Sequence, residues 1–391
     1  MHEHGRTTRP TALDGETAVL VFPSENAGTS VFEQSSDTAC VVSEGRHRHW
    51  YTVAVRLRDE AGFDDPQPEG GEFDDVHPFH AHGYDVLSDT ALVEQLESRG
   101  VRRLVLCGGR TNHEVASTAR SALTRGYEVV VVADTMLAGR TRTRDGVCPP
   151  PQDVHALTLA TLGRLGATVT SVRGVVTGSY EPLVSEYLTA LYTDAVGEAD
   201  FVQAPPLPTP SLYPTTAALV VVNVREEYPA AEFGDRNNNQ AELQIERLVD
   251  AWRARDRLVL HTVHPPRFLP DDSVLQGATV RPMADEPTVE AATADAFVRT
   301  ELDDVLQSRG IEQLVFVGVP LQEAVAGSAR TALERGYDVL IVEDATAGYD
   351  FVDEDGLEVA GTEAHWIEAT SLAALGASLI ETEELCEQLE N

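Results

Sequence analysis

The sequence contains no lysine, because all 29 of its basic residues are arginine. This absence excludes any mechanism that needs a lysine base or a lysine Schiff base. The chain also carries 64 aspartate and glutamate residues, which give it a formal net charge of −35. A surface this acidic repels phosphate backbones, so we expect no nucleic-acid partner.

Cysteine is scarce, and long apolar stretches are missing. The four cysteines among 391 residues match no metal-ligand spacing and form no disulfide framework, so we expect reduced thiols. No run of about 18 or more apolar residues occurs, which argues against a membrane span. Residues 1–14 are polar and lack the apolar core of a signal peptide. We therefore expect a cytoplasmic protein with no membrane association, and we expect no cofactor.

The two halves of the chain carry the same pattern. Thr90–Asp134 aligns without a gap with Thr300–Asp344, and a little under half of the positions are identical. The same offset of 210 residues carries His155 to His365. A repeat this long indicates two duplicated domains rather than a solenoid. Below, the two halves are called copy one and copy two.

Within each copy, short β-branched runs alternate with amphipathic stretches. Copy two shows this with an apolar run at Ile311–Val317, a helical pattern at Ala324–Arg335 that ends at Gly336, and a further strand pattern at Asp338–Val342. The order strand, helix, strand predicts an α/β layer with a buried, mostly parallel sheet. Ligands bind such sheets at the carboxyl ends of the strands, so the segments after Phe22, Leu106, Val222 and Val317 are the places to seek chemistry.

We therefore predict two tandem Rossmann-like units of three layers, each with a mostly parallel sheet of about six strands flanked by helices. The predicted domains are residues 1–200 for copy one and 215–391 for copy two. The proline-rich residues 201–214 are predicted to join them as a semi-rigid linker. We expect the copies to pair as a pseudo-dimer, with further homo-oligomers left open.

The repeated blocks resemble the isochorismatase-like cysteine hydrolase superfamily, which includes nicotinamidases and N-carbamoyl amidohydrolases. In copy two the resemblance is carried by ALVVVN (218–223), by the long block at 300–348 and by AHWIEATSLAALGA (364–377). In copy one it is carried by AVLVFP (18–23), by 90–134 and by VHALTLATLGRLGA (154–167). The resemblance implies a six-stranded parallel sheet in each copy.

The resemblance also implies a catalytic triad. In the family, an Asp after the first strand acts as base, a Lys assists it, and a Cys at the start of a helix attacks an amide or imidate carbon. Such an arrangement makes chemical sense, since a thiolate needs a cation and a base to form. In this sequence all three positions are substituted in both copies: Pro23, Ala81 and Glu114 in copy one, and Asn223, Ala291 and Ala324 in copy two.

The loop before the family cysteine often contains a cis peptide that points backbone N–H groups at an oxyanion. Copy two has Val319-Pro320 at this place, and an X–Pro bond adopts the cis form at little cost. Copy one has Gly109-Arg110 there, where a cis bond would be costlier. The loop of copy two is therefore expected to keep its shape without the nucleophile.

Copy one retains the more reactive set of polar residues. We assign Glu114 and His113 as candidate catalytic residues, with Glu114 as a general acid or base. The candidate binding residues are Arg110, Asn112, Arg58 and His82 in copy one, and Asn223 and Gln322 in copy two. The histidines of VHPFHAHGY (76–84) leave two interpretations open, a metal site or a surface loop, and we assign no metal.

Three functions remain open at this point. The first is a non-catalytic member of the fold that binds a small molecule. The second is an enzyme with rebuilt acid/base chemistry around Glu114, acting on a small carbonyl or cyclic metabolite. The third is a structural pseudo-dimer within a larger complex. The substitutions favour the first, and the family cysteine-hydrolase mechanism is not possible with these residues.

Overall fold

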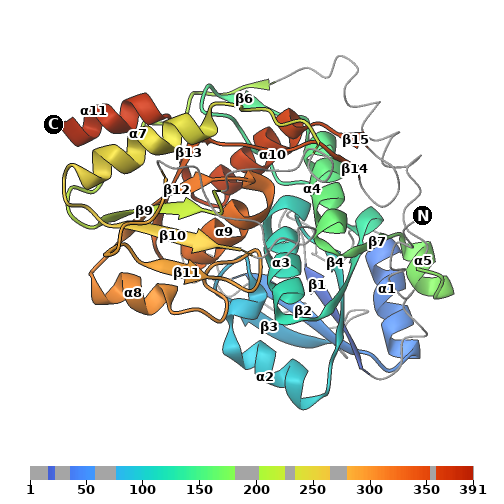
Figure 1. Ribbon diagram of the computed structural model, residues 1–391. Helices are drawn as coiled ribbons and strands as arrows, with labels where there is room; N and C mark the ends of the chain where they lie inside the picture. Colours follow the sequence, from blue (N-terminus) through green and yellow to red (C-terminus); the bar gives the residue numbers. More distant parts are fainter. Residues whose placement is uncertain are drawn as a thin grey trace, which may run out of the picture. The chain divides into compact units, whose positions relative to one another are not determined.

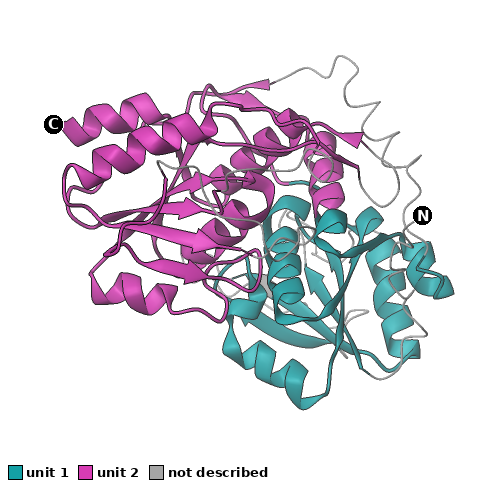
Figure 2. Ribbon diagram, viewed as in Figure 1, with its two compact units in different colours: residues 1–138, 162–190 teal, residues 139–161, 191–391 magenta. Residues whose placement is uncertain are grey.

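A computed structural model describes residues 16–22, 36–57, 76–180, 202–224, 234–264, 280–352 and 358–390. The chain separates into two compact units (Figure 2). Unit 1 comprises residues 1–138 and 162–190, and unit 2 comprises residues 139–161 and 191–391. Among the described residues, no helix is both long and apolar enough to cross a bilayer.

Unit 1 is built on a six-stranded sheet in which all neighbouring strands are parallel (Figure 1). The strand order is β3-β2-β1-β4-β5-β7. The strands are β1 (Thr17–Phe22), β2 (Tyr51–Leu57), β3 (His77–Ala81), β4 (Arg103–Gly108), β5 (Glu128–Val132) and β7 (Thr168–Thr170). The chain thus builds outward from β1 in one direction and then restarts at β4 in the other. The point between β1 and β4 is the topological switch point, where such sheets bind ligands.

Helices cover both faces of this sheet. The helices α1 (Ser36–His47) and α5 (Val172–Thr177) contact each other on the face formed by Val19, Val21, Val105 and Val130. On the opposite side, α3 (Ala116–Arg125) packs on β5. The remaining elements of unit 1 are α2 (Thr90–Ser98) and the short turns η1 (Val86–Ser88), η2 (Thr111–Val115) and η3 (Ala133–Thr135).

Unit 2 contains a second parallel sheet with the same topology, β11-β10-β9-β12-β13-β16. Its strands are β9 (Ala217–Val222), β10 (Val259–Val263), β11 (Thr288–Glu290), β12 (Gln313–Gly318), β13 (Asp338–Thr346) and β16 (Ser378–Ile380). Its helical elements are α7 (Ala241–Arg253), α8 (Leu302–Ser308), η4 (Leu321–Val325), α9 (Ala326–Glu334), α10 (Gly361–Ala374) and α11 (Thr382–Glu390). Two antiparallel pairs complete it: β6 (Val147–Cys148) with β8 (Val202–Gln203), and β14 (Phe351–Val352) with β15 (Glu358–Val359).

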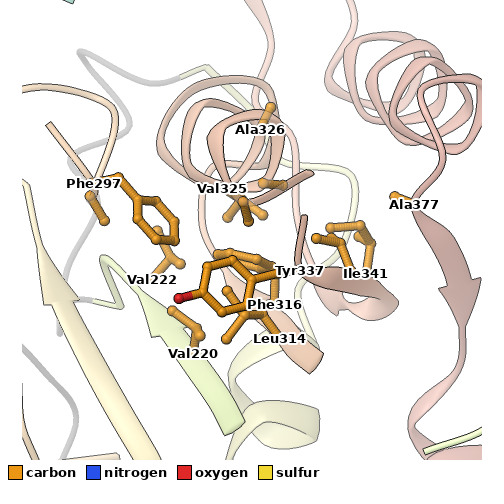
Figure 3. Packing of buried hydrophobic residues seen from close by; sticks show 14 of the residues in the cluster. Val220, Val222, Phe297, Leu314, Phe316, Val325, Ala326, Tyr337, Ile341 and Ala377 are labelled. Carbon is orange, nitrogen blue, oxygen red and sulfur yellow. The ribbon is translucent and has the colours of Figure 1, made fainter. Parts of the chain in front are cut away.

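The sheet of unit 2 has a hydrophobic core on each face. On one face, side chains such as Val220, Leu314 and Phe316 pack against α8, α9 and α10, as Figure 3 shows for part of the cluster. On the other face, α7 and α11 pack over a second cluster that includes the fully buried Trp252. Alternate side chains of the strands therefore supply both cores, as expected for a sheet buried on both sides.

The predicted architecture of two α/β units with parallel six-stranded sheets is confirmed. The strand predicted at Ile311–Val317 is β12, shifted by a residue or two, and β13 runs longer than the predicted Asp338–Val342. The predicted helix stop at Gly336 is confirmed by its left-handed φ angle of 83°, and the equivalent Gly126 of copy one has a φ of 88°.

The compact units do not follow the sequence copies everywhere. Residues 139–161 belong to copy one by the repeat but lie in unit 2, and α4 (Pro151–Leu165) begins there and ends in unit 1. The proline-rich stretch is part of unit 2 and is hydrogen-bonded to the rest of it: the Gln388 amide donates to the Pro210 carbonyl, and the Gln313 amide donates to the Ser211 carbonyl. The predicted domain boundaries at 200 and 215 stay predictions.

At the switch point of each sheet, the first strand lies unusually close to a glycine of the fourth. A Cβ added to Gly108 would lie 2.3 Å from the Phe22 carbonyl oxygen, and one added to Gly318 would lie 2.1 Å from the Val222 carbonyl oxygen. Both glycines also have positive φ, of 76° and 137°. Only glycine avoids both the clash and the backbone strain.

We predict that Gly318→Ala lowers the free energy of unfolding by about 2–4 kcal/mol, because it combines a backbone clash with an unfavourable φ. Chemical denaturation followed by circular dichroism measures this. Gly163→Ala is the matched control: Gly163 lies within α4 and its added Cβ would meet no atom closer than 3.9 Å. That helix substitution is expected to be neutral or stabilising by up to ~1 kcal/mol. Equal losses in the two variants would contradict the close-approach argument.

Candidate functional site

The candidate site of copy one lies where β1 and β4 end. The turn η2 follows β4 directly and carries Asn112, His113 and Glu114, all of them buried. A Cβ added to Gly109 would lie 2.6 Å from the Phe22 Cβ and 2.8 Å from the Glu114 Oε1. The Glu114 carboxylate therefore sits beside the last residue of β1, and only a residue without a side chain fits between them.

The Glu114 carboxylate is held by its neighbour Arg110. The backbone N–H of Arg110 donates to Glu114 Oε1 at 2.7 Å, and the guanidinium Nε donates to Oε2 at 3.1 Å. The Glu114 side chain is 4% exposed, whereas that of Arg110 is 30% exposed. Charge-assisted bonds of this kind are stronger than neutral ones, so the pair fixes the carboxylate against the loop.

Tyr84 joins this group although it lies far along the chain, just after β3. The Arg110 guanidinium lies 5.6 Å from the centre of the Tyr84 ring, and the His113 ring meets the same tyrosine edge-on at 5.5 Å. Arg110 and His113 thus share one aromatic neighbour. The site in unit 1 is a cluster of Glu114, Arg110, His113 and Tyr84.

Burial raises the pKa of the Glu114 carboxyl above its ordinary value of 4.5. The positive charge of Arg110 and its backbone N–H act in the opposite direction and stabilise the ionised form. Burial is the largest effect, so the pKa is raised despite the charge and the hydrogen bonds of Arg110.

The other predicted residues of copy one are spread out. His82 follows β3 and is exposed, while Arg58 and Pro23 lie outside the described residues. His77 and His80 are on strand β3 rather than in a loop, and the His77 ring packs 4.9 Å from that of Tyr51. In the part of the chain that the structure describes, no three His, Cys, Asp or Glu side chains are grouped to hold a metal ion.

In copy two the equivalent site contains amides and alanine. Asn223 follows β9 with a left-handed φ of 52°, and its side-chain amide donates to the Val319 carbonyl at 3.3 Å. Gln322 is buried, and its amide donates to the Tyr349 carbonyl at 3.3 Å. The peptide bond between Val319 and Pro320 is cis, the form that the resemblance to the family indicated as possible at little cost. Ala324 stands at the nucleophile position and offers no reactive atom.

The two positions that correspond to the family lysine are buried alanines. Ala81 is the last residue of β3, and Ala291 follows β11 directly. Both alanines therefore lie at the carboxyl ends of the corresponding edge strands. Next to Ala291's strand, His264 is held by the Thr293 carbonyl at 2.6 Å and the Thr262 hydroxyl at 3.0 Å.

Reasoning from the sequence missed Tyr84, and it named Gly109 only for its peptide bond to Arg110 and not for its close contact with Glu114. The signal for Tyr84 was present in HAHGY, but attention to the histidines of that segment passed over it. Gly109 could have been noticed as a second consecutive glycine at the end of an apolar strand, where a close backbone approach is expected.

The sequence of this chain matches the family model of the isochorismatase domain twice, at residues 35–173 and 217–384. The isochorismatase-family protein YrdC of Bacillus subtilis is 25% identical over 174 residues, which cover 43% of this chain and 93% of that protein. The secreted isochorismatase effector Isc1 of Verticillium dahliae is 27% identical over 159 residues, covering 37% of this chain and 83% of the effector. These relatives therefore correspond in length to one copy.

Shorter but more similar matches also occur. Streptothricin hydrolase of Streptomyces noursei is 38% identical over 78 residues, which cover 20% of this chain and 31% of that enzyme. Among solved structures, an isochorismatase-family protein from Chromobacterium violaceum is 27% identical, with a TM-score of 0.42, and the match covers 47% of this chain and all of that one.

We predict that Arg110→Met raises the pKa of Glu114 further, because the neighbouring cation and its side-chain hydrogen bond are lost while burial remains. Carbon-13 NMR titration of selectively labelled glutamate measures the pKa. Arg99→Met, at the end of α2, is the control and is expected to leave the Glu114 pKa unchanged. An unchanged Glu114 titration in Arg110→Met would show that the pair does not act on the carboxyl.

We also predict a loss of stability in acid from the buried His155. Burial lowers its pKa to about 4, so the unfolded state binds a proton more readily than the folded state. The stability that this histidine supports is complete above pH 6.5 and declines as the pH falls towards 4, by roughly 2–3 kcal/mol. Denaturant unfolding at pH 7.5 and pH 4.5 should therefore show a smaller difference in His155→Gln than in the wild type. The exposed His47 supplies the control: if His47→Gln reduces the difference equally, the assignment is wrong.

Proposed function

The chain belongs to the isochorismatase domain family of hydrolases, and on that premise we propose that it is a non-catalytic member that binds a small molecule. One observation carries the proposal. At the nucleophile position of copy one, the Glu114 carboxylate already accepts the backbone N–H and the guanidinium of Arg110. The loop donor and the cation that could stabilise a reacting group are engaged by the protein's own carboxylate.

The site in copy two supports the same proposal. The amides of Asn223 and Gln322 donate to backbone carbonyls of Val319 and Tyr349, so both side chains brace the surrounding loops. Neither Ala324 nor Ala291 can supply a nucleophile or a cation. Hydrolysis by a thiolate requires all three family residues, and the chain has none of them at these positions in either copy.

We infer that the ligand is a small molecule with a carbonyl group, the feature that amides, ureides and lactams share. Relatives named streptothricin hydrolase and ureidoacrylate amidohydrolase support this choice, since each is similar to part of this chain. The site in copy one is the better candidate for binding, because the Arg110 guanidinium is partly exposed beside Tyr84.

A second candidate function is acid/base catalysis by Glu114. The observation that favours it is the raised pKa of this buried carboxyl, because a pKa closer to neutral suits a general acid. Acid/base catalysis requires that the Glu114 carboxylate break its hydrogen bonds to Arg110, or that it transfer a proton while these bonds remain. The two candidate functions are distinguished by turnover, which acid/base catalysis predicts and non-catalytic ligand binding does not.

Purified protein should be incubated with nicotinamide, ureidoacrylate, streptothricin and isochorismate, and the products separated by liquid chromatography. We expect no turnover above the buffer rate. Thermal denaturation with the same compounds should show a raised melting temperature for a ligand that binds, since saturation at 100 times Kd stabilises by about 2.7 kcal/mol.

Variants distinguish the possible outcomes. Arg110→Met is expected to abolish the ligand-induced rise in melting temperature, and Arg99→Met to retain it. Turnover by the wild type that is lost in Glu114→Gln would overturn the non-catalytic proposal and establish acid/base catalysis. If none of the four compounds shifts the melting temperature, binding of this class of ligand is refuted.

A further inference from the structure

The segment 139–161 is part of unit 2 although the repeat places it in copy one (Figure 2). It contains β6 and the beginning of α4. Copy two therefore does not supply all of unit 2. The contacts that hold the first ten residues of this segment indicate why it lies there.

Backbone hydrogen bonds tie the segment to the proline-rich stretch. β6 pairs in antiparallel fashion with β8. Beyond the paired strands, the N–H of Ala204 donates to the Gly146 carbonyl at 2.7 Å, and the N–H of Leu207 donates to the Arg144 carbonyl at 2.8 Å. The loop around Arg144 is thus held in a defined place next to the residues that lead into β9.

The Arg144 side chain extends from this loop to two carboxylates of copy two. Its guanidinium donates to Glu384 on α11, and its Nε lies 3.7 Å from Glu343 Oε2 on β13. The three side chains are between 24% and 34% exposed. Isolated surface ion pairs contribute little, but a half-buried cation shared by two carboxylates is a network with fixed geometry.

Negative charge accumulates where Arg144 binds. The pKa of Glu343 is raised to about 7, mainly by burial. The charge of Arg144 lowers this pKa, and the charges of Glu381, Asp145 and Asp344 contribute to the increase. The carboxylates of copy two, together with Asp145 of copy one, therefore lie close enough together to disfavour the ionisation of Glu343. A cation at this place relieves their repulsion.

The sequence repeat shows that this contact can form in one direction only, with the arginine from copy one and the carboxylates from copy two. Applying the offset of 210 residues, Glu343 corresponds to Ala133 and Glu384 corresponds to Gly174. Arg144 itself corresponds to Glu354. The equivalent contact of copy two on copy one would therefore lack both carboxylates, and its arginine would be replaced by an acid.

We propose that Arg144 is a one-way docking residue, which fixes the copy-one segment 139–148 to an acidic receptor formed by Glu343 and Glu384 of copy two. Copy one thereby completes unit 2, and the two copies have specialised as donor and receptor of this segment. The proposal concerns assembly of the chain and stands independently of the ligand-binding function.

Hydrogen exchange of the full-length protein, followed by mass spectrometry, tests the docking. In Arg144→Glu, peptides covering 143–148 and 202–207 should exchange roughly tenfold faster, because the docked state is destabilised relative to the open one. Peptides from β1, β4 and α3 in unit 1 should be unchanged. The exposed Arg140 is four residues away, and Arg140→Glu is the control for the change in net charge.

The double variant Arg144→Glu with Glu384→Arg exchanges the two charges, and it separates loss of the ion pair from a general loss of folding. If opposite charge docks the segment, the double variant should recover at least half of the lost hydrogen-exchange protection in these peptides. Glu384→Arg alone should leave the same peptides unprotected. Unchanged exchange in Arg144→Glu, or an equal effect of Arg140→Glu, would overturn the proposal. Failure of the double variant to recover protection while its melting temperature matches the wild type would also overturn it.

Discussion

The pairing of the first strand with the fourth is the constraint on which both units depend. In each sheet a glycine at the end of the fourth strand lets the backbone approach the carbonyl of the first strand to a distance that no side chain would allow, at Gly108 in one and Gly318 in the other. This contact sets the switch point, and the next turn of chain places residue 114 or 324 beside it. Duplication kept this geometry, while the chemistry of the two sites changed independently.

At the site in copy one, one acidic side chain determines what the loop can do. Glu114 is buried against Gly109, and its charge is stabilised locally by the backbone and side chain of Arg110. A carboxylate bound in this way already accepts the backbone N–H that a reacting oxygen would need as its hydrogen-bond donor. In copy two, by contrast, the Asn223 and Gln322 amides bond to backbone carbonyls, so the loops are braced by neutral groups.

The fold could be predicted from the sequence because it depends on repeated, local patterns. The apolar runs and the glycines after the helices indicated both sheets, although strand ends differ by one to four residues. The cis bond before Pro320 was suggested only by the resemblance to the family loop. The site could be predicted only in part. Glu114, His113 and Arg110 do meet, but their shared neighbour Tyr84 comes from another element, and no spacing reports such a contact. The position of segment 139–161 in unit 2 likewise depends on long-range contacts, among them that of Arg144 with Glu384.

The central claim is that the Glu114 carboxylate engages the backbone N–H of Arg110 in the resting protein. The chemical shift of the Arg110 amide proton as a function of pH tests it most directly, because an amide that donates to a carboxylate shifts when that carboxylate is protonated. The account predicts a downfield Arg110 resonance that titrates with the same midpoint as the Glu114 carboxyl and loses its pH dependence in Glu114→Gln. An Arg110 amide whose shift is independent of Glu114 ionisation would contradict it.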